Sequence, residues 1–136
     1  MGKQGSLLAG VAAVDITGTA DEQMDDPLYS RIEADKGTDR LYVKALVLQH
    51  GATTAVVITI DAVAIEEIGS IRNNYLARVR EALQAEFQIA PSSVLVNASH
   101  CHGVVCEDVA ERTIEAVRLA SECLVPVRVG TGTGHE

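Results

Sequence analysis

The residues best suited to chemistry lie together in the stretch Ser-His-Cys-His-Gly, from Ser99 to Gly103. This stretch follows a short apolar segment, 93–98, that is predicted to be a strand. Open α/β sheets usually place their ligand sites just beyond the carboxyl ends of strands. His100 and His102 are two residues apart, so in an extended segment both side chains point to the same side. Because imidazole nitrogens are common zinc ligands, this pair is the leading candidate for a metal site.

Two histidines supply at most half of a structural zinc site. A third ligand must come from Asp61, Asp15, Cys106 or another chain. Asp61 is a good candidate because it lies at the end of the neighbouring predicted strand, 54–60. The ends of the two strands lie close together if those strands pair. The alternative is that both histidines are polar loop residues hydrogen-bonded to the backbone, and their spacing leaves both interpretations open.

The cysteines offer a second kind of chemistry. A nearby imidazolium lowers the pKa of a thiol, so Cys101 between two histidines is a candidate nucleophile. Alternation in an extended segment turns it away from both neighbours, which favours a buried and inert cysteine. Cys106 and Cys123 are interpreted as packing residues of a helix. An odd number of cysteines with no Cys-x-x-Cys pair argues against a disulfide framework and favours a reducing compartment.

Two polar segments complete the search for sites. The connection 17–40 is long and acidic, but its carboxylates do not follow the calcium-loop pattern, so a solvated loop is favoured. The alternating glycines of 130–134 are followed by no helix and cannot form a phosphate-binding loop. We expect 131–136 to be a flexible tail.

The elements that position the histidine pair follow from the hydrophobic pattern. Strands are predicted at 7–14, 42–49, 54–60, 93–98 and 125–130, and helices at 68–88 and 106–124. The strands 42–49 and 54–60 have hairpin spacing with Gly51 in the turn. The order β-loop-β-β-α-β-α-β predicts an α/β fold, a single mixed sheet of about five strands packed against two helices. The strand 54–60 is apolar on both faces, which predicts a central strand covered by helices.

Composition restricts the classes of function. The length of 136 residues suits a single domain, 1–136, with an aliphatic core, since there is no Trp and one Phe. A formal charge of −8 opposes nucleic-acid binding. The longest apolar run, 55–65, is too short for a membrane span of about 20 residues. The first residues lack a secretory signal, so we expect a cytoplasmic protein. A small core with strand edges also favours a homo-oligomer.

Five stretches resemble, in order, the N-terminal part of the neutral/alkaline non-lysosomal ceramidase family: 9–17, 39–48, 57–61, 91–103 and 126–132. The first ends in Asp-Ile-Thr, the third in Asp61, and the fourth contains Ser-His-Cys-His-Gly, which is similar to the family's Thr-His-Thr-His-Ser-Gly-Pro motif.

The resemblance implies zinc-assisted hydrolysis of the amide of an N-acyl sphingoid lipid, with His100 as a zinc ligand and His102 in the same active site, our candidate catalytic residue. After His102 the family's Ser-Gly-Pro is replaced by Gly103-Val104-Val105. The family's remaining zinc ligands come from residues beyond this stretch.

We therefore expect a free-standing ceramidase-like domain that lacks the complete zinc hydrolase site and works as an assembling or ligand-binding protein. Its ligand is expected to be a small or lipid-like molecule. The alternative is a small zinc-dependent amide hydrolase whose site is completed across a subunit interface, with His100, His102 and Asp61 as metal ligands.

Overall fold

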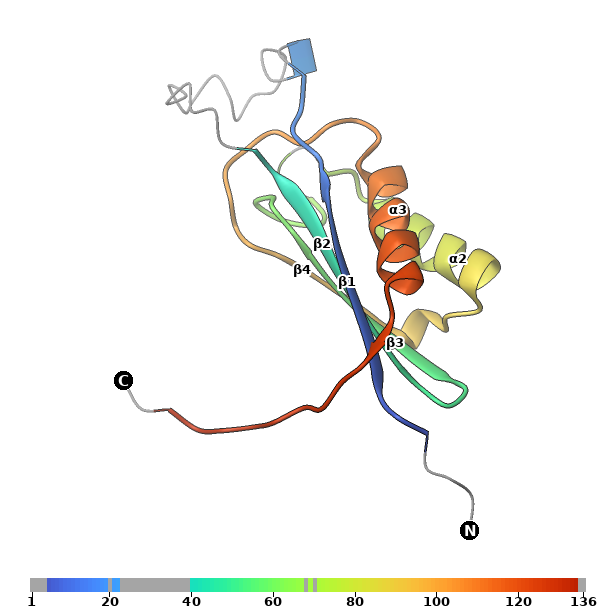
Figure 1. Ribbon diagram of the computed structural model, residues 1–136. Coiled ribbons are helices and arrows are strands. Elements are labelled where there is room, and N and C mark those ends of the chain that lie inside the picture. The colour runs from blue at the N-terminus through green and yellow to red at the C-terminus, as the bar shows by residue number, and fades with distance from the viewer. Residues whose placement is uncertain (1–4, 20, 23–39, 68, 70, 135–136) are drawn as a thin grey trace.

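The computed structural model describes residues 5–19, 21–22, 40–67, 69 and 71–134. They form a mixed five-stranded sheet with two helices packed against it (Figure 1). The strands are β1 (Leu8–Asp15), β2 (Tyr42–His50), β3 (Thr53–Ile60), β4 (Val94–Ala98) and β5 (Val125–Pro126). The helices are α2 (Tyr75–Phe87) and α3 (Val109–Glu122), and a short 3₁₀ turn, Pro91–Ser93, precedes β4. The predicted α/β class and element order are confirmed.

The sheet has the strand order β4-β3-β2-β1-β5. Strands β2 and β3 form the predicted antiparallel hairpin, and Gly51 in its turn has a φ of 58°, a left-handed conformation that glycine adopts without strain. Strand β4 is parallel to β3, with Ala98 opposite Ile60, as the crossover through α2 requires. The carboxyl ends of β3 and β4 therefore meet at one edge of the sheet.

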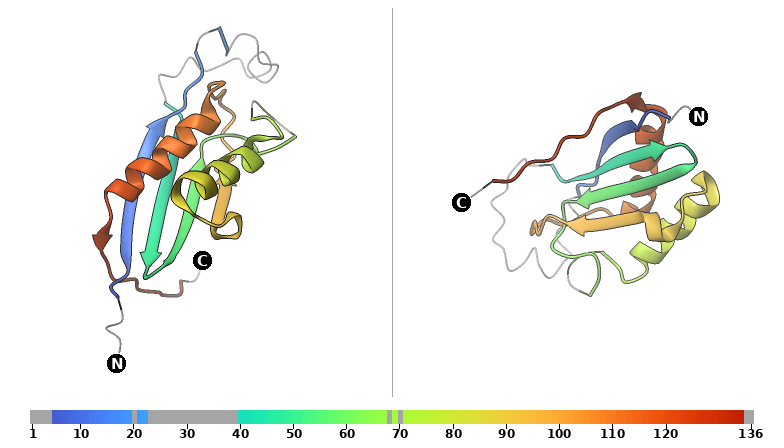
Figure 2. Two further views of the ribbon diagram at one scale, coloured as in Figure 1. Left: turned by 90° about the vertical axis from the view of Figure 1, so that its right-hand side faces the viewer. Right: turned by 90° about the horizontal axis from the view of Figure 1, so that it is seen from below.

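Both helices lie on the same face of the sheet, as the two views of Figure 2 show. On β3, Val56, Ile58 and Ile60 face this layer and are at most 1% exposed, whereas Val57 and Thr59 are half-buried on the other face. The prediction that β3 is covered by helices thus holds for one face only. The reason is topological, because the connections through α2 and through α3 both pass over the same side.

Two cross-strand rows on the face without helices are apolar. We call their residues the open-face patch: Val11, Leu46, Val57 and Leu95 in one row, and Val125, Ala9, Leu48 and Ala55 in the other.

Helix α3 packs directly on β1 through Gly10. A Cβ at Gly10 would lie 1.9 Å from the carbonyl oxygen of Ala120, so only glycine allows this approach. The core between the layers is aliphatic except for a buried polar pair, Tyr75 and Thr113. The Tyr75 hydroxyl lies 2.8 Å from Thr113 Oγ1, which donates in turn to the Val109 carbonyl. This chain of hydrogen bonds satisfies both hydroxyls and joins α2 to α3.

Two element boundaries differ most from the predictions. The predicted helix 68–88 begins only at Tyr75, because Asn73 and Asn74 are poor helix formers and form a turn before it. The predicted strand 125–130 ends at Pro126, since β5 pairs only with Leu8 and Ala9. One further hydrogen bond joins Val127 N to Leu7 O at 2.9 Å.

Most of the predicted acidic loop 17–40 lies outside the described residues, and so do residues 135 and 136 of the predicted tail. The described tail residues, 131–134, are exposed and have no regular secondary structure. Among the described helices, neither α2 nor α3 is long and apolar enough to cross a membrane.

Candidate functional site

The site is built on the adjacent ends of β3 and β4. Asp61 follows β3 and Ser99 follows β4, and the backbone continues the pairing beyond the strands through Ser99 N to Ile60 O at 2.9 Å. The Ser99 hydroxyl donates to Asp61 Oδ1 at 3.0 Å. The structure thus brings Asp61 beside the segment that contains His100, as parallel pairing of these strands predicts.

The Asp61 carboxylate already has several partners. Its Oδ1 accepts from Ser99, and its Oδ2 accepts from the backbone N–H of Tyr42 at 3.0 Å and lies 3.9 Å from Lys44 Nζ. Its side chain is only 19% exposed. Asp61 therefore ties β2, β3 and the segment after β4 together, and a metal ion would have to compete with these contacts.

His100 is held in an unusual conformation. Its φ of 60° lies in the left-handed region, where histidine is enriched over most other residues with a side chain. Its Nδ1 lies 2.9 Å from the carbonyl oxygen of Val63. Because a carbonyl only accepts hydrogen bonds, Nδ1 is the protonated nitrogen and donates to it. In the neutral imidazole this leaves the lone pair of Nε2 free to bind a ligand or accept a proton.

His102 lies close to His100, with their ring centroids 5.0 Å apart and the rings nearly perpendicular. Both side chains are exposed. The candidate site is therefore an accessible pair of imidazoles on the segment whose Ser99 is hydrogen-bonded to the half-buried Asp61 carboxylate, and a polar group of a ligand can reach it from solvent.

A complete zinc site is not formed by the described residues, which contain no group of three or more His, Cys, Asp or Glu side chains placed to hold a metal ion. Of the other candidate ligands, Asp15 accepts hydrogen bonds from Thr17 N and from Arg40. Cys106 is buried, and this burial raises the pKa of its thiol to about 12. Of the candidate ligands in this part of the chain, His100 and His102 lie together, with ring centroids 5.0 Å apart.

The cysteines divide into three environments, all with free thiols. Cys106 is 4% exposed, in agreement with its predicted packing role. Cys101 is half-buried and packs against the core. Cys123 is exposed, so its predicted packing role is wrong, because it follows the last turn of α3 where the chain leaves the core.

Sequence reasoning missed a polar network where α3 begins. Arg112 binds the carboxylate of Asp108 at 2.9 Å and the backbone carbonyl of Asp15 at 2.8 Å. Hydrogen bonds from Thr17, with a smaller contribution from Arg40, lower the pKa of Asp15. The i, i+4 spacing of Asp108 and Arg112 was the only signal of this network in the sequence.

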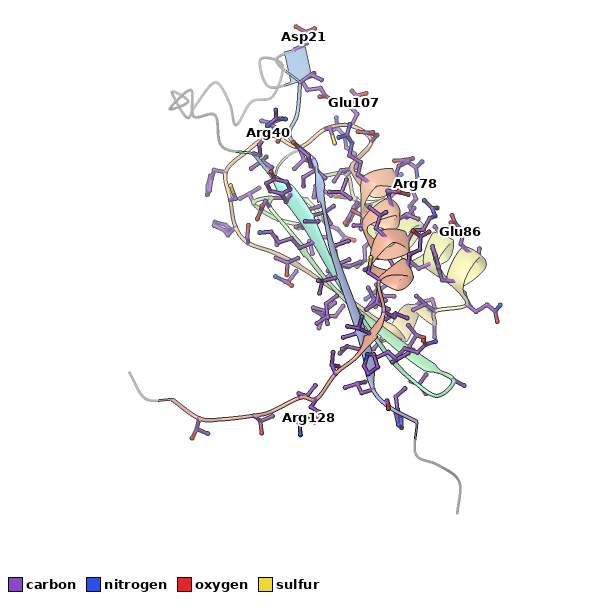
Figure 3. All side chains as sticks on the ribbon, in the orientation of Figure 1. Asp21, Arg40, Arg78, Glu86, Glu107 and Arg128 are labelled. Carbon is purple, nitrogen blue, oxygen red and sulfur yellow. The ribbon has the colours of Figure 1, made fainter. Side chains whose placement is uncertain are left out.

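Glu22 also lies at this end of the molecule. The acidic-loop interpretation predicts that its side chain is solvated, whereas its carboxylate is hydrogen-bonded to the backbone. Its Oε1 accepts from the backbone N–H of Glu107 at 2.8 Å. Hydrogen bonds from Thr19 and then from Glu107 lower the pKa of Glu22. Figure 3 shows Glu107 at the end of the molecule that also holds Asp21. Glu22 therefore attaches the start of the 17–40 connection to the segment before α3.

A shallow groove on the outer side of the helices is lined by charged residues that pair with one another. Arg78 pairs with Glu111, and Arg118 pairs with Glu86 and Glu115. Because each of these carboxylates and guanidinium groups already has an ion-pair partner, the strand-end cluster remains the better candidate.

No protein-family model matches the chain, and no curated protein matches it. The fold is similar to that of a solved structure described as "Ceramidase complexed with C2", with a TM-score of 0.58 and 16% sequence identity. The match covers 90% of this chain and 22% of the ceramidase chain, so the chain spans about a fifth of that protein. The chain therefore has a ceramidase-like α/β fold.

Proposed function

We propose that this chain is a ceramidase-like domain of the neutral/alkaline type that binds a small or lipid-like ligand at the ends of β3 and β4 and does not hydrolyse amides by itself. The observation that carries the proposal is the group of Asp61, Ser99, His100 and His102, in which two exposed imidazoles directly follow the serine that is hydrogen-bonded to the Asp61 carboxylate.

The chemistry of the cluster supports binding. In its neutral form His100 offers Nε2 as an acceptor, and Lys44, 57% exposed, offers a cation on the same sheet edge. A ligand with a hydroxyl or amide group can donate to the imidazole and accept from the lysine. The apolar open-face patch begins two residues along the strand from Lys44, at Leu46, which would favour a ligand with an apolar portion.

The second candidate is a small zinc-dependent amide hydrolase whose metal site is completed across a subunit interface. The hydrogen bond from His100 Nδ1 to Val63 O favours it, because metal-binding histidines almost always donate their other ring N–H in this way. In this case His100 and His102 would be ligands from one subunit, with Asp61 as the nearest carboxylate, and the remaining ligands would come from a partner. His102 would belong to the catalytic site.

We also propose that the chain associates with itself, and that it works in a reducing, cytoplasmic setting, for which its free thiols are the support.

Metal analysis separates the two functions. The protein is purified without added metal or chelator, and its zinc content is compared with that of a His100→Asn, His102→Asn variant. Asparagine is chosen because it tolerates the left-handed conformation of His100. His50→Asn is the matched control, since His50 is an exposed histidine at the opposite end of β2 from Tyr42.

About one zinc per chain that is lost in the double variant and kept in the control would support the hydrolase and overturn the non-hydrolytic proposal. Folded protein without zinc, whose His100 and His102 ring signals shift when a small amide or lipid-like probe is added, is the result expected from the binding function. An N-acyl sphingoid amide in a detergent micelle is the first probe, and unchanged signals with it and with short acyl amides would overturn ligand binding at this cluster.

A further inference from the structure

His100 has a backbone conformation that its neighbours must impose. Its φ of 60° lies in the left-handed region. A residue with a Cβ is strained there and keeps this conformation only where the surrounding contacts fix it. The contacts on either side of His100 therefore decide where its imidazole points.

Backbone hydrogen bonds hold the residues before and after His100. Before it, Ser99 N donates to Ile60 O at 2.9 Å. After it, Cys101 N donates to Ala62 O at 3.2 Å. The backbone of the segment after β3 thus determines the path of the segment after β4.

The imidazole uses the next carbonyl of the same segment, since His100 Nδ1 donates to Val63 O at 2.9 Å. Because β3 ends at Ile60, Val63 lies beyond its strand pairing. Asp61 fixes the chain between them, because its N–H donates to Tyr42 O at 2.9 Å and its Oδ2 accepts from Tyr42 N at 3.0 Å. The position of the Val63 carbonyl therefore depends on Asp61, together with the packing of the Val63 side chain, which is 8% exposed.

The Ser99 hydroxyl joins the Asp61 carboxylate to His100. It donates to Asp61 Oδ1 at 3.0 Å, and Ser99 directly precedes His100 in the chain. This bond and the backbone bond of Ser99 together fix the chain where it enters the left-handed conformation. Asp61 thus orders both partners of the hydrogen bond between Nδ1 and the carbonyl, the donor through Ser99 and the acceptor through its own backbone.

We infer that Asp61 is a positioning residue that, through Ser99, keeps His100 in the tautomer with Nδ1 protonated and Nε2 presented to the ligand. The inference rests on the proposed function and names the residue that orients its ligand-binding imidazole. Which ring nitrogen carries the proton is set by the hydrogen bond that the ring makes. When the bond to Val63 O weakens, the other tautomer becomes populated, and it presents a donor at Nε2 where the ligand's hydroxyl or N–H needs an acceptor.

Nitrogen NMR of the isotopically labelled whole chain tests this inference, because protonated and unprotonated imidazole nitrogens have distinct chemical shifts. Spectra are recorded without ligand at about pH 9, where imidazole is neutral. The His100 signals are assigned by their loss in His100→Asn. His50, an exposed histidine at the hairpin end of β2, is the internal reference and should keep its tautomer ratio in every variant.

Ser99→Ala removes the link to Asp61 and leaves the bond between Asp61 and Tyr42 in place. We expect the ratio of the Nδ1-protonated to the Nε2-protonated form of His100 to fall at least about twofold, as for the loss of a weak hydrogen bond. Ser99→Thr keeps the hydroxyl and should retain the wild-type ratio. A general loss of stability would not produce this difference between alanine and threonine in the folded protein.

Asp61→Asn is a second variant, since the amide NH₂ that replaces one carboxylate oxygen cannot accept from Ser99 or from Tyr42 N. It should shift the His100 ratio in the same direction. An unchanged ratio in Ser99→Ala, or an equal fall in Ser99→Thr, would overturn the inference. Because the free protein is measured, a wild-type chain whose histidine signals ignore the amide probes would overturn the proposed function and not the positioning role of Asp61.

Discussion

Replacing Gly10 by alanine should destabilise the protein strongly, because the helix layer rests on this residue. The new Cβ would lie 1.9 Å from Ala120 O and 3.0 Å from the Ala120 carbonyl carbon, both backbone atoms of α3. Ordinary contact begins at 3.4 Å, so α3 or β1 must move by about 1.5 Å at this point. No side-chain rotation can relieve the overlap.

The size of the loss in stability depends on the contacts of α3 that the displacement would break. On α3, Thr113, Ala116, Val117 and Ala120 are fully buried against the sheet or its neighbours. A gap of 0.5–1 Å already removes about a quarter to a half of the attractive energy of each dispersion contact. Overpacking of a core typically lowers the free energy of unfolding by about 1–3 kcal/mol, occasionally more. Alanine also restricts the backbone of the unfolded chain more than glycine does, but this stabilises the folded protein by only about 0.4–1 kcal/mol. Because the overlap is with backbone atoms, the cost lies at or above the upper end of this range, and we expect Gly10→Ala to lower the free energy of unfolding by about 2 kcal/mol or more.

Urea denaturation followed by circular dichroism measures this quantity, with the slope of the transition compared between variants. Gly130→Ala is the matched control, since nothing lies within 4 Å of a Cβ there, and it should change the stability by less than about 0.5 kcal/mol. A Gly10→Ala variant as stable as Gly130→Ala would refute the close packing of α3 on β1.

Two further predictions concern titrating groups. Burial raises the pKa of Tyr75 to about 12 from 10.0, so the stability that its neutral hydroxyl contributes is present below pH 10 and is lost as the pH rises from 10 to 12. Tyr75→Phe should reduce this loss of stability at alkaline pH, measured by thermal unfolding. An unchanged dependence of stability on pH between 10 and 12 would contradict this prediction. A hydrogen bond from the Cys106 thiol and then the Arg112 guanidinium lower the pKa of Asp108 from 3.8, so its contribution is present above pH 3.8 and is lost as the pH falls through the lowered value. Asp108→Asn should therefore unfold at lower urea concentration at pH 7 than wild type and differ less from it at pH 3, and an equal difference at both pH values would count against the network.

Much of the architecture could be predicted from local patterns. Apolar runs located β1 to β4, the helical spacing of Tyr75, Val79 and Leu83 located α2, and the Gly51 turn indicated the hairpin. The helix between β3 and β4 predicted their parallel pairing, and this pairing placed Asp61 beside Ser99. The site could be approached in this way because strand order decides which chain ends meet at a sheet edge.

The failures share a different cause. The length of β5 depends on where β1 begins, because antiparallel pairing beyond Pro126 runs past Leu8, the first residue of β1. Cys123 is exposed because it follows the last turn of α3. Neither the length of β5 nor the exposure of Cys123 depends on the conformational preferences of the residues concerned. The role of Glu22 could not be predicted because its partner, the backbone N–H of Glu107, is 85 residues away in the sequence.

The sequence by itself determined the order and type of the elements, the aliphatic core and the position of His100 and His102 after a strand, because these depend on patterns within a few neighbouring residues. Only the tertiary structure decided which partners occupy the carboxylate of Asp61, which nitrogen of His100 is free, and which face of the sheet remains uncovered. An apolar face has the same sequence pattern whether a helix or another molecule covers it, because burial depends on contacts with residues that are not its neighbours in the sequence.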